Sequence, residues 1–137
     1  MLDSQVPKPF GPEDFRGVAV SPDGKFVLGY KDRAAWIIPI SGSEPGRQIG
    51  VVTPKEFASG WTADSQGVYV ESSDTIPAKI DVLDIKTGQR KFFKEYSPAD
   101  PSGVPGLGGA SVTPDGRFMA FGVARTLSYL YVVEGLK

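Results

Sequence analysis

The stretch VSPDGKF at residues 20–26 recurs as WTADSQG at 61–67 and as VTPDGRF at 112–118, and the three copies align without a gap. Their central aspartates lie 41 and 51 residues apart. One blade of a β-propeller, a four-stranded antiparallel sheet, takes about 40–45 residues. The spacing therefore predicts three blades in tandem, with a longer connection before the third.

Each copy has the composition of a tight turn between two antiparallel strands. Proline fixes the backbone φ at the first central position, aspartate can bond nearby amides, and glycine takes a positive φ without strain. A carboxylate repeated in every blade could also form a shared acidic site, but the turn role explains its repetition. We therefore expect structural turns at Asp23, Gly24, Asp64, Asp115 and Gly116.

The segments around each turn have the residues of β-strands. Small apolar segments before the turn predict inner strands, and aromatic or β-branched segments after it predict second and third strands. The inner strands are expected at 17–20 and 109–112, the second strands at 26–30, 68–71 and 118–123, and the third strands at 36–40, 80–85 and 130–133. Fourth strands are expected at 46–51 and 89–96, and the third copy has none.

These elements predict an all-β fold of about three four-stranded antiparallel blades, an incomplete β-propeller closed by self-association. The 17 Gly and 12 Pro among 137 residues agree with many turns and few long helices. We expect one propeller fragment with an N-terminal segment that can supply a closing outer strand (1–12), blade 1 (13–51), blade 2 (52–96), a Pro/Gly-rich loop (97–109) and blade 3 without an outer strand (110–137).

At these positions the sequence resembles the TolB-type, WD-like propeller repeat, in which a Ser/Thr-Pro-Asp-Gly turn precedes an aromatic-rich second strand. The end of the chain, from Val112 through ARTLSYLYVVEGLK at 124–137, is similar to the C-terminal end of propellers attached to bacterial membrane-anchored serine/threonine protein kinases. This resemblance implies an extracytoplasmic sensing or scaffolding propeller without its kinase. The chain departs from the repeat at Ser65, which replaces the turn glycine.

The sequence contains no histidine and no cysteine. Ser-His-Asp triads, histidine acid–base chemistry, cysteine nucleophiles and the usual zinc sites are thereby excluded. We expect no enzyme, no cofactor and no metal site. Two alternatives stay open: a hydrolase or lactonase-like propeller that holds a metal through carboxylates, and the accessory propeller of a serine peptidase.

Three weaker patterns each have a structural explanation that we prefer. Residues 106–109, GLGG, could cradle a phosphate, but no Lys-Ser/Thr follows and a loop is expected. Asp81 and Asp84, with Asp74 upstream, could surround a calcium ion, although solvated charges at a strand edge also explain them. Aromatic residues could form a stacking platform or simply pack between blades; they are Trp36, Trp61, Tyr69 and Tyr131.

The best-placed binding surface is the loop face, the end of the blades that carries the second-to-third-strand loops and the connections between blades. Loops on a rigid scaffold commonly hold binding residues. The mixed charge of these loops suits a peptide or a polar small molecule. The candidates are Lys31, Asp32, Arg33, Asp74, Thr75, Arg125, Thr126 and the loop 97–109.

Charge and hydropathy exclude other partners. The formal net charge is −1 with both signs dispersed, so we expect no nucleic-acid binding. The most apolar run, 34–40, has only the length of a strand, and the start of the chain is not that of a signal peptide. We therefore expect no membrane segment, and the compartment is left open.

The blade count predicts a partner. Propellers close with about four to eight blades because each blade packs between two neighbours. Three blades leave two sheet faces uncovered, and uncovered faces favour the association of chains. We expect a homodimer that closes a six-bladed ring, in which the N-terminal segment of one chain adds the outer strand to the last blade of the other.

Overall fold

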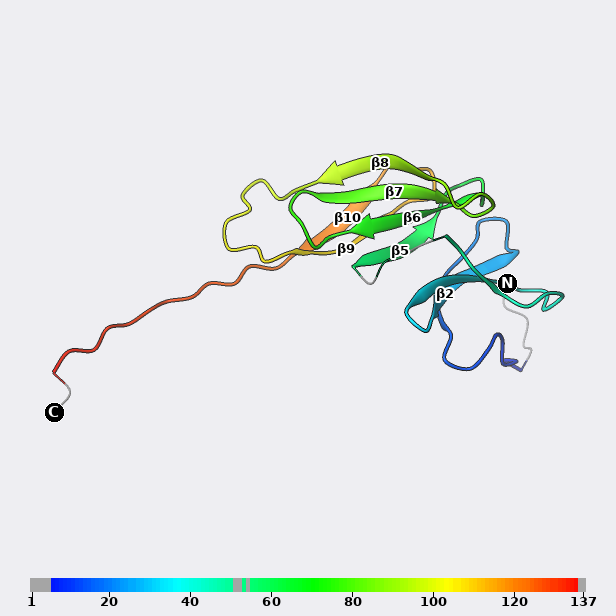
Figure 1. The fold of residues 1–137 in the computed structure, drawn as a ribbon, viewed down its shortest axis with the longest axis horizontal. Helices are drawn as coiled ribbons and strands as arrows, with labels where there is room; N and C mark the ends of the chain where they lie inside the picture. Colours follow the sequence, from blue (N-terminus) through cyan, green and yellow to red (C-terminus); the bar gives the residue numbers. More distant parts are fainter. Residues whose placement is uncertain (1–5, 51–52, 54, 136–137) are drawn as a thin grey trace.

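The computed structural model describes residues 6–50, 53 and 55–135. These residues form an all-β structure of three antiparallel sheets that follow one another along the chain, with four, four and two strands (Figure 1). The sheets do not close into a ring, as expected of an incomplete propeller. No helix in this part of the chain is long and apolar enough to cross a membrane.

Each sheet corresponds to one copy of the repeat, and strands adjacent in sequence are adjacent in the sheet. Blade 1 contains β1 (Arg16–Val20), β2 (Phe26–Lys31), β3 (Ala34–Pro39) and β4 (Arg47–Gln48). Blade 2 contains β5 (Glu56–Trp61), β6 (Gly67–Ser72), β7 (Ala78–Asp84) and β8 (Arg90–Tyr96). Blade 3 contains β9 (Leu107–Val112) and β10 (Met119–Val123).

Most of the predicted strands are present, and the fourth strand of blade 1 is shorter than expected. β4 has two residues, and the last residue of its expected range, residue 51, lies outside the described residues. The predicted strand at 130–133 is wrong within this chain, because residues 124–135 contain no strand. Residues 6–12 also form no strand here. Blade 3 therefore lacks both its third and its fourth strand in the described residues.

The loop predicted at 97–109 ends earlier than expected, because β9 starts at Leu107. The glycines that suggested a loop, or a phosphate cradle, belong to the ladder between β9 and β10, where Gly108 pairs with Gly122. A Cβ atom at Gly108 would lie 3.7 Å from the Gly122 carbonyl oxygen. This glycine pair is part of a sheet, so the loop predicted for residues 107–108 is wrong, whereas the inner strand predicted at 109–112 is present and begins two residues earlier.

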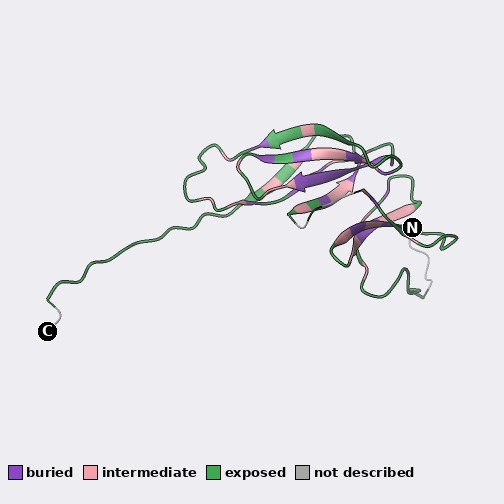
Figure 2. Cartoon of the chain, viewed as in Figure 1, coloured by how far each residue is buried: buried purple, intermediate pink, exposed green. Residues whose placement is uncertain are grey.

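Apolar side chains pack in two layers between the blades. Figure 2 marks the buried residues in purple along the strands. Full burial of one such Leu or Ile contributes about 1.5–3 kcal/mol. The layer between blades 1 and 2 includes Leu28, Ile37, Trp61, Val68 and Leu83. The layer between blades 2 and 3 includes Tyr69, Ile80, Tyr96, Leu107 and Val112.

Blade 1 has an outward face, turned away from blade 2, which the N-terminal segment partly covers. The Phe15 ring lies over Gly29, where a Cβ atom would approach a ring carbon to 2.4 Å. A Cβ atom at Gly11 would lie 3.3 Å from Ile38, whose side chain is buried. The expectation that both end faces are uncovered is therefore only partly met.

Candidate interaction surface

The three aspartates of the repeat hold their own turns. A hydroxyl donates to Oδ1 of Asp23, Asp64 and Asp115 at 2.6, 2.6 and 2.5 Å. The same oxygen accepts the N–H two residues later at 3.1, 3.0 and 3.0 Å. The hydroxyl bond is the largest cause that lowers the pKa of each carboxyl. The donors are the hydroxyls of Ser21, Thr62 and Thr113.

The position after each aspartate has a left-handed backbone, with φ of 71° at Gly24, 58° at Ser65 and 70° at Gly116. Serine is less tolerant of this conformation than glycine. Ser65 makes an additional contact, because its Oγ accepts the Asp23 N–H at 3.1 Å. This exception to the glycine pattern therefore joins the turn of blade 1 to the turn of blade 2.

In both complete blades, the side chain at the same position of the second strand bonds the first strand of the next blade. The Tyr30 hydroxyl of β2 bonds the Ala58 backbone of β5. Glu71 lies 41 residues after Tyr30 and accepts the N–H of Ala110 in β9 at 2.6 Å. These residues were not among the candidates predicted from the sequence. Only their equivalent positions in the repeat could have identified them. The third copy has Gly122 at this place and no side chain to extend.

The outward face of blade 3, turned away from blade 2, is uncovered in the described residues. Met119 and Val112 are partners in the ladder and pack toward blade 2. Because successive strand residues point to opposite faces, the next pair, Ala120 and Ser111, points outward, and both residues are exposed. Phe118, just before β10, is 67% exposed. Blade 3 thus presents a flat face of small side chains with an exposed phenylalanine at its end.

On the loop face, Asp32 and Arg33 form the two-residue turn between β2 and β3, with φ of 51° and 63°. Two positive φ values are typical of a tight hairpin turn. The Lys31 ammonium lies 5.6 Å from the centre of the Trp36 ring. Arg33 borders a shallow pocket of about 320 Å³ together with Tyr30, Thr53, Glu56 and Phe57.

An ion pair fixes the start of blade 2 beside this pocket. Arg90 binds both carboxylate oxygens of Glu56, at 2.6 and 2.9 Å. These hydrogen bonds lower the pKa of Glu56 from 4.5 to about 2. Asp74 pairs with Lys55 at 3.2 Å, and the Thr75 hydroxyl donates to the Pro77 carbonyl at 3.3 Å.

Arg125 and Thr126, the remaining loop-face candidates, bond the loop before blade 3, and we call these contacts the clamp. Arg125 donates to the Asp100 carboxylate at 3.0 Å, to the Asp100 carbonyl at 2.7 Å and to the Ser102 carbonyl at 3.1 Å. The Thr126 N–H donates to the Gly103 carbonyl at 2.8 Å. Hydrogen bonds from Ser102, and then from Arg125, lower the pKa of Asp100 to about 2. These hydrogen bonds hold the loop in place and engage both terminal nitrogens of the Arg125 guanidinium.

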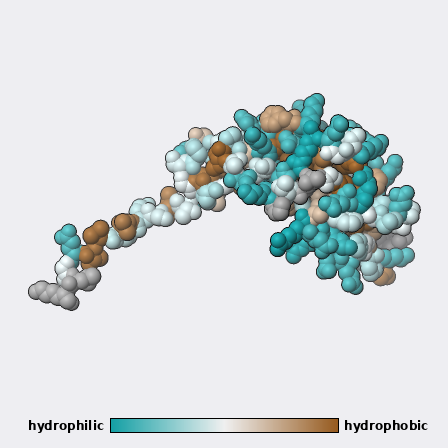
Figure 3. All heavy atoms as spheres, viewed as in Figure 1, coloured by the Kyte–Doolittle hydropathy of each residue, from teal (hydrophilic) through white to brown (hydrophobic). Residues whose placement is uncertain are grey.

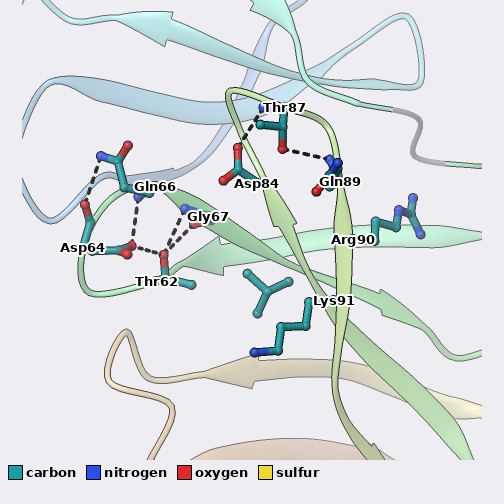
Figure 4. A pocket seen from close by; sticks show the side chains of 10 residues that line it. Thr62, Asp64, Gln66, Gly67, Asp84, Thr87, Gln89, Arg90 and Lys91 are labelled. Atoms are coloured by element: carbon teal, nitrogen blue, oxygen red, sulfur yellow. Dashed lines mark hydrogen bonds between the residues drawn. The ribbon is translucent and has the colours of Figure 1, made fainter.

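The residues considered for calcium have separate contacts. Asp81 lies 3.9 Å from Arg90, Asp74 pairs with Lys55, and Asp84 accepts the backbone N–H groups of Lys86 and Thr87, both at 2.8 Å. Figure 4 shows Asp64 and Asp84 on two neighbouring turns around a pocket of about 360 Å³. Among the described residues, no group of three or more acidic side chains is placed to hold a metal ion.

The aromatic residues considered for a stacking platform are not assembled into one surface. Trp61 and Tyr69 are buried between blades. Trp61 donates its indole N–H to the Ala19 carbonyl at 3.1 Å. Trp36 is half-buried on blade 1, while Tyr131 is exposed beyond β10. Packing between blades therefore explains two of the four residues.

Comparisons with known proteins assign the chain to no family. No family model matches the chain, and no curated protein matches it. The arguments about function therefore rest on the geometry of the blades.

Proposed function

We propose that the chain is a non-catalytic interaction module of the propeller type, which associates with a second copy of itself through blade 3. The observation that carries this proposal is the incomplete blade 3. In the described residues, β10 pairs with β9 alone, and the outward face of this sheet is exposed. An unpaired strand edge is a template for pairing with another chain.

The six-bladed ring stays a prediction, and the N-terminal segment bears on it. Ring closure would join the outward face of blade 3 to the outward face of blade 1 of the second copy. Phe15 and Gly11 lie on that face of blade 1. This segment would have to lie in the joint or move aside, whereas association through blade 3 alone needs no such change.

The TolB-type identity of the repeat is part of the proposal, supported by the three turns with Ser or Thr two residues before the aspartate. A peptide or polar small molecule would use the exposed turn at Asp32 and Arg33, whereas Arg125 and Thr126 are engaged in the clamp. Nuclear magnetic resonance with short charged peptides tests this assignment. Shifts confined to the loop face support it, and unchanged spectra at millimolar peptide contradict it.

Light scattering on a gel-filtered sample tests the association. We expect twice the mass of one chain at micromolar concentration. Ala120→Asp places a charge on the exposed outward face of blade 3 and should give monomers, while Gln48→Glu on exposed β4 should not. Urea unfolding verifies that both variants are folded. A folded wild-type monomer at all concentrations would contradict the proposal.

A further inference from the structure

The C-terminal arm, residues 127–135, leaves the body of the protein and contacts no sheet (Figure 1). Leucine, valine and tyrosine side chains follow one another along it, and brown spheres in Figure 3 mark the hydrophobic ones. They are between 69% and 93% exposed: Leu127, Tyr129, Leu130, Tyr131, Val132 and Val133. Exposed apolar residues in such a series are typical of a surface that binds another chain.

The arm occupies the place of a third strand in the repeat. β3 starts 11 residues after Asp23, and β7 starts 14 residues after Asp64. The same spacing after Asp115 would start a strand between residues 126 and 129, where the arm begins. The aromatic and β-branched residues of the arm are those favoured in strands. Sequence and spacing thus give blade 3 a third strand that does not pair within the chain.

Two features keep the arm from folding back onto its own β10. Residues 124–134 contain no Gly, Pro, Asn or Asp, and none of them has a positive φ. Blade 1 turns at this place through Asp32 and Arg33, both with a positive φ. The clamp also holds Thr126 against Gly103, upstream of β9. Because β9 lies on the opposite edge of β10, the clamp directs the chain away from the free edge.

We propose that the arm of one copy pairs antiparallel with the free edge of β10 in a second copy and supplies its missing third strand. This proposal rests on the proposed self-association and names the contact that produces it. Exchange of identical elements between two copies is reciprocal and forms a closed dimer. Antiparallel pairing brings the end of the arm, with Glu134, toward the start of β10, where Arg117 is exposed.

Hydrogen exchange of the full chain tests the exchange of arms. In the dimer, the amides of residues 127–133 should exchange at least about 100-fold more slowly than in a free peptide, since strand pairing protects them. Dilution to the monomer should abolish this protection. A dimer with an unprotected arm would overturn the exchange of arms and leave the association intact. A chain that stays monomeric overturns both proposals, and an arm protected in the monomer shows pairing with its own β10.

Two matched variants separate backbone pairing from apolar character. Val132→Pro removes an N–H from the arm and disfavours a strand. Val132→Thr keeps the N–H and the β-branched shape. Because residue 132 is exposed and outside the sheets, neither change should alter folding. We expect Val132→Pro to weaken the dimer at least about tenfold and Val132→Thr much less; equal effects would overturn the proposed pairing.

Discussion

Glu71 accepts the backbone N–H of Ala110 at 2.6 Å, so a buried carboxylate of blade 2 holds the inner strand of blade 3. The other carboxylate oxygen accepts the hydroxyl of Tyr96, which lies on the outer strand of blade 2. Within each sheet, backbone hydrogen bonds join neighbouring strands, and side chains at one repeated position connect the sheets. Blade 3 has Gly122 at that position, and no further sheet follows it in the described residues.

Removal of this carboxylate should destabilise the protein more than its neutralisation. Glu71→Ala leaves the buried N–H of Ala110 and the Tyr96 hydroxyl without their acceptor, and we expect a loss of about 2–4 kcal/mol in the free energy of unfolding. Glu71→Gln keeps an amide oxygen as acceptor, and its loss should be about 1 kcal/mol. Urea unfolding measures both. Equal losses would show that the acceptor is dispensable.

A side chain at Gly29 should displace the N-terminal segment. A Cβ atom there would lie 2.3 Å from the Arg16 carbonyl oxygen and 2.4 Å from the Phe15 ring. Backbone must shift, and we expect Gly29→Ala to cost about 2–3 kcal/mol. Gly109→Ala is the matched control, since no atom lies within 4 Å of its Cβ position. If both variants unfold at the same urea concentration, Phe15 does not cover blade 1 as described.

The ion pair between Glu56 and Arg90 predicts a dependence of stability on pH. The folded pKa of Glu56 is lowered from 4.5 to about 2. Its contribution is therefore fully present above about pH 4.5 and is lost as the pH falls through about 2. At pH 7, Glu56→Gln should cost about 1–2 kcal/mol. Unfolding of both proteins between pH 7 and pH 2 should show this difference shrink, and a constant difference would contradict it.

Calcium should have no effect on stability, because Asp74, Asp81 and Asp84 engage different partners. A ligand that binds the native state raises the melting temperature. We expect millimolar calcium chloride and a chelator to give the same melting temperature within about 1 °C. A rise of several degrees with calcium would revive the metal-dependent hydrolase as an alternative function.

The sequence contains enough information to predict the strands and the turns of the complete blades, because these follow from local rules. A Ser/Thr-x-Asp turn forms from residues within a few positions. The β-branched and aromatic residues Val68, Tyr69 and Val70 of β6 favour a strand by themselves. The predictions from sequence were wrong where the structure of a segment depends on a distant strand that pairs with it. Gly108 favours a loop by composition but pairs with Gly122 in the ladder of β9 and β10, and residues 130–133 have strand composition without a strand partner in the described residues.

Contacts between blades were the least predictable part. Glu71 lies in the predicted second strand at 68–71, where nothing in the sequence indicates a buried carboxylate. It is 2% exposed, and Tyr96 and Ala110 satisfy its oxygens. Only its alignment with Tyr30 in the repeat marks the position. Among the loop-face candidates, Arg125 and Asp74 are paired with neighbours that no local pattern identifies.

Sedimentation of the wild-type chain over a wide concentration range tests the central claim most directly. If blade 3 of two copies associates, the mass should rise from one to two chains with concentration and stay at two. The Ala120→Asp variant should remain a folded monomer, because it places a charge on β10, the strand at whose free edge we propose that the second copy pairs. A wild-type chain that stays monomeric and folded up to millimolar concentration would contradict association through blade 3.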